Sequence, residues 1–370
     1  MKLRSLAILA AVAALMGLAV SSRAVVEATD TKACAQCHPK QVQEWTRSAH
    51  GAAGVSCASC HPAEKLHQPS PEAAVPDYSA EACAKCHDQE FREWKASAHN
   101  IPVPYAPDEI APELITDCVR CHNVRGYVRV LRGPVPFAQS KGQVVDASSP
   151  GVTCSACHDP HASSPAMLRA GSPAQTCDHC HGDKWQNLVL NGTGGQRYPG
   201  SDYGKSAVSP HNTGDRCVAC HMAKTPGVEA GGHTLKMKDA QGRLNLNGCL
   251  PCHQGIRDFN VGGKQAETQE LLASLAETLK ARNLGELPRN QPGKCNECHR
   301  GGTEPFRNDP NGILEQAFQN YRLFAFDRSL GVHNPAYTRQ LLQESLQHVL
   351  QGYSGAPAPR GAEGCCGHQG

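Results

Sequence analysis

Apolar side chains recur at helical spacing toward the C-terminal end of this chain. Three runs there repeat at intervals of three and four residues, which places the members of each run on one face of an α-helix. Pro288, Pro292 and Gly293 separate the first run from the second. The sequence therefore predicts three amphipathic helices between residues 265 and 355. The runs consist of Leu271, Leu272, Leu275 and Leu279; Leu314, Phe318 and Tyr321; and Tyr337, Leu341 and Leu342.

The sequence before residue 265 has no comparable apolar pattern. The whole chain has 35 glycines and 26 prolines among its 370 residues, and only 5% of the residues are aromatic. Glycine and proline favour turns, and so few large apolar side chains cannot fill the interior of a chain of this length. We predict a mainly α fold with extensive loops and little β structure, whose interior is filled by something other than side chains.

Nine copies of the motif CxxCH indicate what fills the interior. They contain 18 of the 20 cysteines and 9 of the 19 histidines. CxxCH is the attachment signature of c-type haem: the two thiols bond to the porphyrin, and the histidine becomes an axial ligand of the iron. The copies are Cys34/Cys37/His38, Cys57/Cys60/His61, Cys83/Cys86/His87, Cys118/Cys121/His122, Cys154/Cys157/His158, Cys177/Cys180/His181, Cys217/Cys220/His221, Cys249/Cys252/His253 and Cys295/Cys298/His299.

Zinc sites and disulfides are the alternative explanations of paired cysteines. The motif starts are separated by between 23 and 46 residues, so no fixed zinc-finger spacing emerges. Neither explanation accounts for a histidine after every second cysteine. We therefore predict nine covalently bound haem c groups that serve as the core, so that the chain before residue 300 does not fold without them.

Ten further histidines lie outside these motifs. They matter because iron with two histidine ligands is coordinatively saturated and suited to passing electrons, whereas an open position permits substrate chemistry. His179 either ligates an adjacent haem or faces solvent, His348 shares the face of an apolar helical run, and His368 lies near the C-terminus. We predict distal iron ligands at His50, His67, His99, His161, His211, His233 and His333.

An internal repeat contains two of these candidates. The segment from Cys34 to His50 aligns without a gap to the segment from Cys83 to His99, with nine of 17 positions identical. Each segment reads as a short helix that carries a tryptophan. Its last histidine lies about three helical turns beyond the proximal histidine. We therefore expect His50 and His99 each to ligate a neighbouring haem.

The fourth haem motif allows two interpretations. No histidine follows His122 until His158, and the intervening stretch contains Arg125 and Tyr127 among several basic residues. If the haem at His122 were five-coordinate, Arg125 and Tyr127 would be candidate catalytic residues that bind and protonate a small oxyanion at the iron. In the other interpretation, which we favour, the arginines pair with haem propionates on a strand over residues 127–131.

The N-terminal residues indicate export. Lys2 and Arg4 precede an apolar stretch, and Ser22-Arg23-Ala24 has the small residues of a signal cleavage site. No later stretch approaches about 18 uninterrupted apolar residues, so we expect no integral membrane span once the signal is removed. This predicts a periplasmic or extracellular protein. A formal net charge of +2 without any basic run does not predict nucleic-acid binding.

The motifs divide the sequence into successive regions. We expect a signal peptide at residues 1–24, a region with haems one to four at 25–150, a region with haems five to eight at 151–264, a helical region with the ninth haem at 265–355, and a disordered tail at 356–370. The role of Cys365 and Cys366 in that tail stays open.

Several segments resemble known multihaem c-type cytochromes. The repeats that end at His50 and His99 resemble the CxxCH-to-Trp-x-x-Ser-Ala-His pattern of tetrahaem nitrification cytochromes and decahaem electron-transfer cytochromes. The runs Cys217 to His233 and Gly331 to Pro335 resemble the group of cytochrome c nitrite reductase, hydroxylamine oxidoreductase and octahaem tetrathionate reductase. The second resemblance implies that His233 and His333 are distal ligands and that paired haems lead to one open haem. The catalytic CxxCK motif usual in the nitrite reductase does not occur in this sequence.

These observations predict an exported nonahaem electron carrier of anaerobic respiration, in which each iron cycles between Fe(III) and Fe(II). Its expected redox partners are a quinol dehydrogenase, another cytochrome or a terminal reductase, and the C-terminal helices offer a surface for oligomers. The alternative is an oxidoreductase that acts on nitrite, hydroxylamine or a tetrathionate-type sulfur oxyanion at one five-coordinate haem. A subunit of an extracellular haem filament is a third hypothesis.

Overall fold

Helices and connecting loops make up the part of the chain that the computed structural model describes, which is residues 29–61, 78–100, 121–131, 151–283, 285–288, 303–306 and 309–352. Within these ranges there is no β-strand, and the β structure consists of isolated bridge residues, including the bridges His158 to Leu168 and Lys238 to Leu244. The prediction of a mainly α fold with extensive loops is therefore confirmed. None of the described helices combines the length and the apolar character needed to cross a membrane.

Contacts divide the chain into two compact units. The first unit consists of Met1–Asp77 and Asp159–Met167, and the second consists of Tyr78–His158 and Leu168–Gly370. The boundaries predicted at residues 24, 150, 264 and 355 were placed from the positions of the haem motifs and from changes in composition. They stay predictions.

The first unit is built from short helices around two haem motifs. Ser48 caps one of them by accepting a hydrogen bond from the backbone nitrogen of Gly51 at 3.1 Å. Ser48 and Ser56 are the buried residues in the described part of this unit, and no apolar side chain there is buried. The polypeptide alone thus supplies this unit with no apolar core. The elements are α2 (Thr29–Ala35), α3 (Pro39–Thr46), α4 (Ala49–Ala52), η1 (Cys57–Ser59) and η6 (Pro165–Met167).

The second unit continues with short helices as far as residue 263. They are α5 (Glu81–Ala84), α6 (Asp88–Lys95), η4 (Ala98–Asn100), α8 (Val124–Leu131), α9 (Cys154–Cys157), α10 (Pro173–His181), α11 (Trp185–Leu190), α12 (Arg216–His221), η7 (Gly232–Thr234) and η8 (Val261–Gly263).

Helix α8 corrects one expectation. We expected a strand over residues 127–131, but the segment is helical. The reason is its apolar spacing: Val124, Tyr127 and Val128 lie three and four residues apart, so they share one helix face and pack together with Ala156. A strand would have placed Tyr127 and Val128 on opposite faces.

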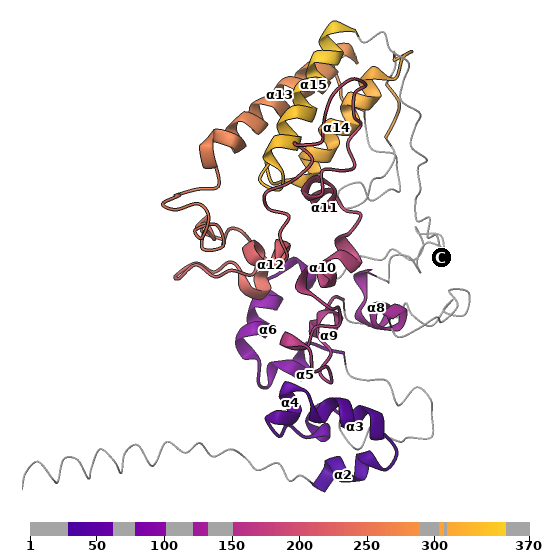
Figure 1. Ribbon diagram of the computed structural model, residues 1–370, viewed down its shortest axis with the longest axis vertical. Helices are drawn as coiled ribbons and strands as arrows, with labels where there is room; N and C mark the ends of the chain where they lie inside the picture. The colour runs from indigo at the N-terminus through magenta and orange to yellow at the C-terminus, as the bar shows by residue number, and fades with distance from the viewer. Residues whose placement is uncertain are drawn as a thin grey trace, which may run out of the picture. The chain divides into compact units, whose positions relative to one another are not determined.

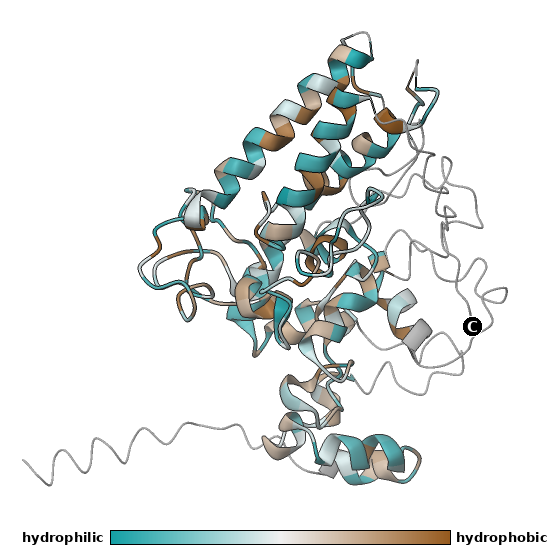
Figure 2. Ribbon diagram, turned by 45° about the horizontal axis from the view of Figure 1, so that its top comes forward, coloured by the Kyte–Doolittle hydropathy of each residue, from teal (hydrophilic) through white to brown (hydrophobic). Residues whose placement is uncertain are grey.

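Three long helices complete the second unit and confirm the predicted apolar runs. They are α13 (Lys264–Arg282), α14 (Ile313–Asp327) and α15 (Pro335–Gln351), and they pack against one another with α11 beside α14 (Figure 1). Hydrophobic and hydrophilic positions alternate along each of them (Figure 2). Leu275, Leu323 and Leu341 are among the fully buried side chains of this core. In contrast to the first unit, this region has an apolar interior of its own.

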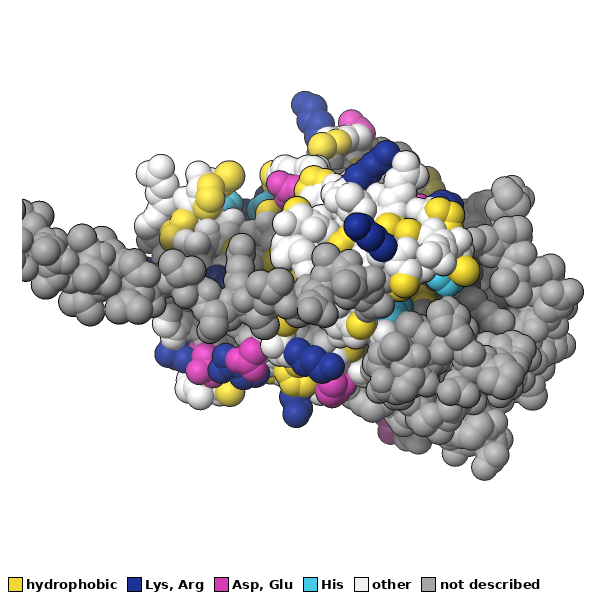
Figure 3. Space-filling model, turned by 90° about the horizontal axis from the view of Figure 1, so that it is seen from below, with side chains coloured by type: hydrophobic (Ala, Val, Ile, Leu, Met, Phe, Trp, Pro, Cys, Tyr) yellow, Lys and Arg dark blue, Asp and Glu magenta, His cyan; other side chains and the backbone are white. Residues whose placement is uncertain are grey.

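Basic and acidic side chains are interspersed on the described surface. Figure 3 shows Lys and Arg next to Asp and Glu on one face, with neither sign dominating. Individual pairs include Arg92 with Asp88 at 2.7 Å and Arg339 with Glu267 at 2.7 Å. Such exposed pairs contribute little to stability, about 0 to 1 kcal/mol each.

The loop after α11 is pressed against α14 and α15, and this close approach requires a glycine. A Cβ atom on Gly195 would overlap the Leu341 side chain and lie 2.7 Å from the Tyr337 hydroxyl, and both of those side chains are fully buried. Gly195→Ala is therefore expected to lower the free energy of unfolding of this region by about 1 to 3 kcal/mol. Denaturant unfolding followed by helix circular dichroism measures the loss. Gly214→Ala is the matched control, because a Cβ on Gly214 meets nothing within 4 Å; an equal loss in both variants would contradict the packing argument.

Candidate haem-binding site

Each haem motif that the structure describes in full forms one helical turn. In the second motif the backbone nitrogen of His61 donates to the carbonyl of Cys57 at 2.8 Å, and in the fifth His158 donates to Cys154 at 2.9 Å. Because residues i, i+3 and i+4 share a helix face, the two thiols and the imidazole of a motif lie on the same side of the turn. None of the fifteen cysteines at described positions is in a disulfide. Cys118, Cys295, Cys298, His299 and the candidate His67 lie outside the described residues, as do His368, Cys365 and Cys366.

Many of the predicted attachment residues lie at the surface of the polypeptide and not in an interior made of side chains. We expected the haems to form the core. Consistent with a site for a haem, these cysteines and histidines are not covered by the protein's own side chains. A thiol can bond to a porphyrin only where no side chain covers it, so the exposure is compatible with attachment. The exposed residues are Cys37, Cys60, Cys86 and Cys252 among the cysteines, and His38 and His87 among the proximal histidines.

Iron ligation stays a prediction at every motif, including the first, third and fourth. Cys34 is half-buried, and so are Cys121 and His122 in the turn before α8. The Nδ1 atom of His87 lies 4.0 Å from the carboxylate of Glu90, a distance too long for a hydrogen bond. His38, His87 and His122 belong to none of the five histidine pairs described next, so their role as proximal ligands rests on the motif alone.

Five motif histidines face a second histidine from a distant part of the chain. Within each pair the ring centroids are 6.1 to 6.4 Å apart. Four of these pairs lie in the second unit, and the pair in the first unit joins residues 61 and 161. The pairs are His61 with His161 at 6.1 Å, His181 with His99 at 6.2 Å, His158 with His233 at 6.3 Å, His253 with His211 at 6.2 Å, and His221 with His333 at 6.4 Å.

This separation fits two axial ligands of one metal ion. A histidine nitrogen binds a transition metal at about 2.0 to 2.1 Å, and the ring centroid lies about 1.1 Å behind that nitrogen, so two opposed ligands have centroids about 6.2 to 6.4 Å apart. The rings of His348 and Tyr198 stack more closely, at 4.1 Å. Across the described ranges no three His, Cys, Asp or Glu side chains converge to hold a metal ion. The histidines meet in pairs, which is compatible with a metal held by a planar porphyrin that has four nitrogens of its own.

Hydrogen bonds orient several of these rings. The Nδ1 atom of His221 donates to the carbonyl of Leu235 at 2.9 Å, that of His211 donates to the carbonyl of Val332 at 2.6 Å, and that of His333 donates to the carboxylate of Asp327 at 2.5 Å. Since the acceptors carry no proton, Nδ1 must hold one. Nε2 is then left as the metal-binding nitrogen, and the ring orientation is fixed.

Burial favours the neutral state that a ligand needs. Burial lowers the pKa of His99 to about 4, with a further contribution from the nearby His181. Burial is also the largest cause that lowers the pKa of His61, His181 and His221. His333 differs: burial is the largest single cause and lowers its pKa, but the hydrogen bond to Asp327, the charge of Asp327 and the nearby Cys217 and Cys220 together outweigh this and leave the pKa raised. Metal ions bind the unprotonated nitrogen of a histidine, so the buried pairs are ready to bind one.

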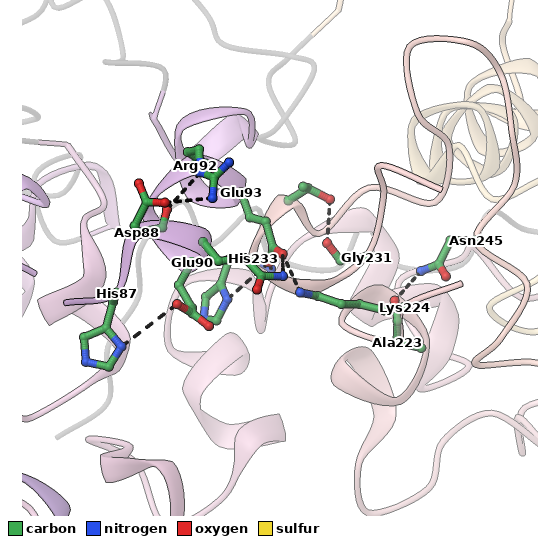
Figure 4. Close-up of polar contacts among 12 residues, drawn as sticks. His87, Asp88, Glu90, Arg92, Glu93, Ala223, Lys224, Gly231, His233 and Asn245 are labelled. Atoms are coloured by element: carbon green, nitrogen blue, oxygen red, sulfur yellow. Dashed lines mark hydrogen bonds and ion pairs between the residues drawn. The ribbon is translucent and has the colours of Figure 1, made fainter. Parts of the chain in front are cut away.

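A carboxylate holds the loop that carries His233 (Figure 4). Glu93 of α6 accepts a hydrogen bond from the backbone nitrogen of His233 at 2.9 Å and forms an ion pair with Lys224. Burial is the largest single cause and raises the pKa of Glu93, but the interactions with Lys224, the His233 backbone and Gln89 together outweigh it, so the pKa is lowered and the carboxylate stays charged. The His233 Nδ1 atom lies 3.7 Å from Glu93, which is too far for a hydrogen bond. Glu93 therefore positions the loop rather than the ring.

The remaining candidates have other partners. His50 has its Nδ1 atom 3.3 Å from the carbonyl of Pro160, and His348 is half-buried on α15, where it stacks on Tyr198. Neither belongs to one of the five pairs, so the predicted ligand role of His50 stays a prediction.

The candidate oxyanion site after the fourth motif has no support from the described residues. Tyr127 is buried, and its hydroxyl lies 2.6 Å from the Nδ1 atom of His179. Arg125 lies in α8, but its side chain is outside the described residues. The structure thus gives Tyr127 a histidine partner on α10, because the apolar face of α8 turns this residue inward.

Cysteines of different motifs touch one another. The neighbouring Cys217 thiol raises the pKa of Cys177, and the neighbouring Cys249 thiol raises the pKa of Cys220, so the thiols of each pair lie close together. Cys83 makes a similar contact with Cys154. The attachment points of the sixth, seventh and eighth motifs therefore adjoin in that order.

The chain is similar to known haem proteins in one motif and in fold. Residues 148–186 match the family described as the doubled CXXCH motif. The structure is similar to that of the outer cell wall cytochrome OcwA, with a TM-score of 0.53, 19% sequence identity, and 80% of this chain and 70% of that chain covered. The chain has the fold of multihaem c-type cytochromes and contains their haem-attachment motif.

A second solved structure gives a weaker likeness. The undecahaem cytochrome from the S-layer of Carboxydothermus ferrireducens has a TM-score of 0.49 and 20% sequence identity to this chain, over 81% of this chain and 50% of that chain. This chain thus spans about half the length of that structure. A search of curated proteins gave no match.

Sequence reasoning missed the residues that orient the ligands. Asp327, Glu93 and the carbonyl acceptors have no motif, because their role depends on which loop folds over which haem site. Only the paired histidines carry a signal in the sequence, since haem motifs are dense enough that most other histidines lie near one.

Proposed function

We propose that this cytochrome is an exported nonahaem protein that carries electrons between redox partners, with bis-histidine ligation at five or more of its haems. The five opposed histidine pairs carry this proposal. When bound, haem iron supplies a one-electron redox couple. The cysteines of each motif would hold the porphyrin covalently, and the two histidines of each pair would both ligate its iron. A site closed in this way would exclude substrate and favour electron transfer over chemistry at the metal.

The distal ligands come from segments far from the motifs that they face. His99 follows the third motif but faces the sixth, and His333 follows the ninth but faces the seventh. Each haem then ties two remote segments together. This explains how loops with few apolar contacts keep a defined arrangement.

The contacts between cysteines support a continuous route. Thioether positions that adjoin bring porphyrin edges close together, so we infer that the sixth, seventh and eighth haems are neighbours in that order. The contact of Cys83 with Cys154 makes the third and fifth haems neighbours as well. A route of this kind suits a protein that passes electrons from haem to haem.

The site of action is proposed from the N-terminal residues and the similar structures. The segment from Lys2 to Ala24 has the features of an export signal. OcwA is an outer cell wall cytochrome, and the undecahaem relative is from an S-layer. We therefore place this protein outside the cytoplasmic membrane, where a membrane quinol dehydrogenase, a second cytochrome or a terminal reductase would exchange electrons with it. An oligomer through the C-terminal helices remains part of this proposal.

The number of haems and the state of their iron test the proposal. The mass of the native protein should correspond to nine attached haems, and electron paramagnetic resonance of the oxidised protein should show at least five low-spin irons. Addition of cyanide or nitrite should leave those signals unchanged. Fewer than five low-spin irons would contradict the bis-histidine assignment, and a high-spin signal that shifts with nitrite would favour the alternative oxidoreductase.

Gly231 permits a sharper test at the haem of the fifth motif. Gly231 has a φ of 78°, and a Cβ there would overlap the carbonyl oxygen of Ala223. Gly231→Ala is expected to displace the loop that carries His233 and to convert one low-spin iron to high-spin, as followed by electron paramagnetic resonance. Gly227→Ala is the control, because its φ is 77° but a Cβ meets nothing within 4 Å. If both variants behave alike, the clash with Ala223 is not what matters.

A further inference from the structure

We propose that Asp327 is a positioning residue that lowers the reduction potential of the haem held by His221 and His333, relative to the haem held by His253 and His211. The inference rests on the proposed function, because it takes both histidine pairs to be axial ligands. It concerns a residue that belongs to no haem motif.

Asp327 is fixed at the end of α14. Its side chain is 1% exposed, and its Oδ1 atom lies 2.5 Å from the Nδ1 atom of His333. Its other oxygen, Oδ2, accepts hydrogen bonds from the backbone nitrogen of Ser329 at 3.3 Å and from the Ser329 hydroxyl. Both carboxylate oxygens are thus held, and one of them points at the ligand ring.

The residue before His333 serves the other haem. His211 donates from its Nδ1 atom to the carbonyl of Val332 at 2.6 Å, so the eighth haem's distal ligand has a neutral acceptor. The same loop is braced by Ser209, whose hydroxyl donates to the carbonyl of His333 at 2.5 Å and accepts from the backbone nitrogen of His211 at 3.1 Å. One short loop therefore supplies a charged hydrogen-bond acceptor, Asp327, to the distal ligand of the seventh haem. It supplies an uncharged acceptor, the Val332 carbonyl, to the distal ligand of the eighth.

The other carboxylate near a distal ligand does not have this geometry. Glu93 lies 3.7 Å from the Nδ1 atom of His233, and its charge is balanced by Lys224. On the proximal side of the seventh haem, His221 donates to the carbonyl of Leu235 at 2.9 Å. Of the Nδ1 hydrogen bonds of His211, His221 and His333, only the last goes to a charged group.

A charged acceptor changes the ligand. A hydrogen bond from Nδ1 to a carboxylate makes Nε2 a stronger electron donor, and a stronger donor stabilises Fe(III) more than Fe(II). The negative charge itself acts in the same direction, and burial strengthens it because a low dielectric screens charges weakly. Both effects lower the potential of the seventh haem. Electrons that arrive there would move on to a neighbour with a higher potential, which includes the eighth haem.

Asp327→Asn in the haem-loaded protein tests this inference. Asparagine keeps the size and an oxygen acceptor but removes the charge. In a redox titration followed by electron paramagnetic resonance, the Fe(III)/Fe(II) equilibrium of one haem should move toward Fe(II) by about tenfold, which is about 59 mV for a one-electron couple. The potentials of the other haems should not move. Glu277→Gln is the control, because it removes an equal charge from an exposed carboxylate paired with Lys280; an equal shift in the control would overturn the proposal.

Two further variants separate the possible failures. If Asp327→Asn keeps every low-spin signal and no potential moves, Asp327 has no such role while the ligation stands. If His333→Ala leaves the number of low-spin irons unchanged, the ligation itself is refuted. Should Asp327→Asn fail to load haem, Ser329→Ala serves instead: the carboxylate then has one donor fewer, so the potential of that haem should shift to a more negative value. No shift, or a positive one, would overturn the proposal.

Discussion

Protein produced without haem is expected to lose the structure of the first unit entirely while the helices α13, α14 and α15 remain packed. The first unit buries only Ser48 and Ser56 among its described residues, so the polypeptide brings almost no apolar surface to its interior. Ordering a residue costs about 1 to 2 kcal/mol of backbone entropy, and burial of a large apolar side chain returns about 1.5 to 3 kcal/mol. With no such side chain buried among the described residues, those residues offer nothing that offsets the entropy, and the haems are expected to do so.

The C-terminal region is different, because Leu275, Leu279, Phe324 and Tyr337 are all fully buried in one core. Hydrogen exchange measured by mass spectrometry on haem-free and haem-loaded protein separates the two regions. Amides of residues 29–61 should exchange at the rate of an unfolded chain without haem, whereas those of α13 and α15 should keep protection. Protection of residues 38–61 in the haem-free protein would contradict the view that haem is the core of that unit.

The sequence predicts the structure best where apolar side chains form the core. The runs that include Leu275, Phe318 and Leu341 predicted three helices, because there apolar side chains alone determine the packing. The segment after His122 was expected to be a strand and is the helix α8, because Val124, Tyr127 and Val128 share one apolar helix face. That spacing is itself a local signal for a helix, so the strand interpretation of this segment was wrong.

The histidine pairs show the same limit at the site. The motifs identify the proximal residues directly, since cysteine and histidine spacing is dictated by the porphyrin. Which distal residue faces which motif depends on the path of loops in space, and no periodicity encodes it. His161 closely follows His158 of the fifth motif in sequence, yet the structure places it against His61 of the second. Asp327 and its contact with His333 depend on that path even more strongly, since one loop must reach two haem sites.

The second large effect follows from these crossed pairs: His99→Ala is expected to open the haem of the sixth motif and to leave the haem of the third motif unchanged. His99 lies 6.2 Å, centroid to centroid, from His181, although in sequence it follows Cys83 and Cys86. Loss of the imidazole would leave that iron with one protein ligand. One iron should change from low-spin to high-spin in electron paramagnetic resonance, and that iron should then bind cyanide.

A pair of double variants identifies the haem that changes. In a background where Cys177→Ser and Cys180→Ser prevent attachment of the sixth haem, His99→Ala should have no further effect on the number of low-spin irons. In the matched background with Cys83→Ser and Cys86→Ser, the third haem is missing and the effect of His99→Ala should persist in full. Residues that act on one haem are coupled, and residues that act on different haems are additive, so the comparison assigns the ligand without a structure of the loaded protein. The reverse result would mean that His99 ligates the haem of its own repeat, and the crossed arrangement that ties remote segments together would be wrong.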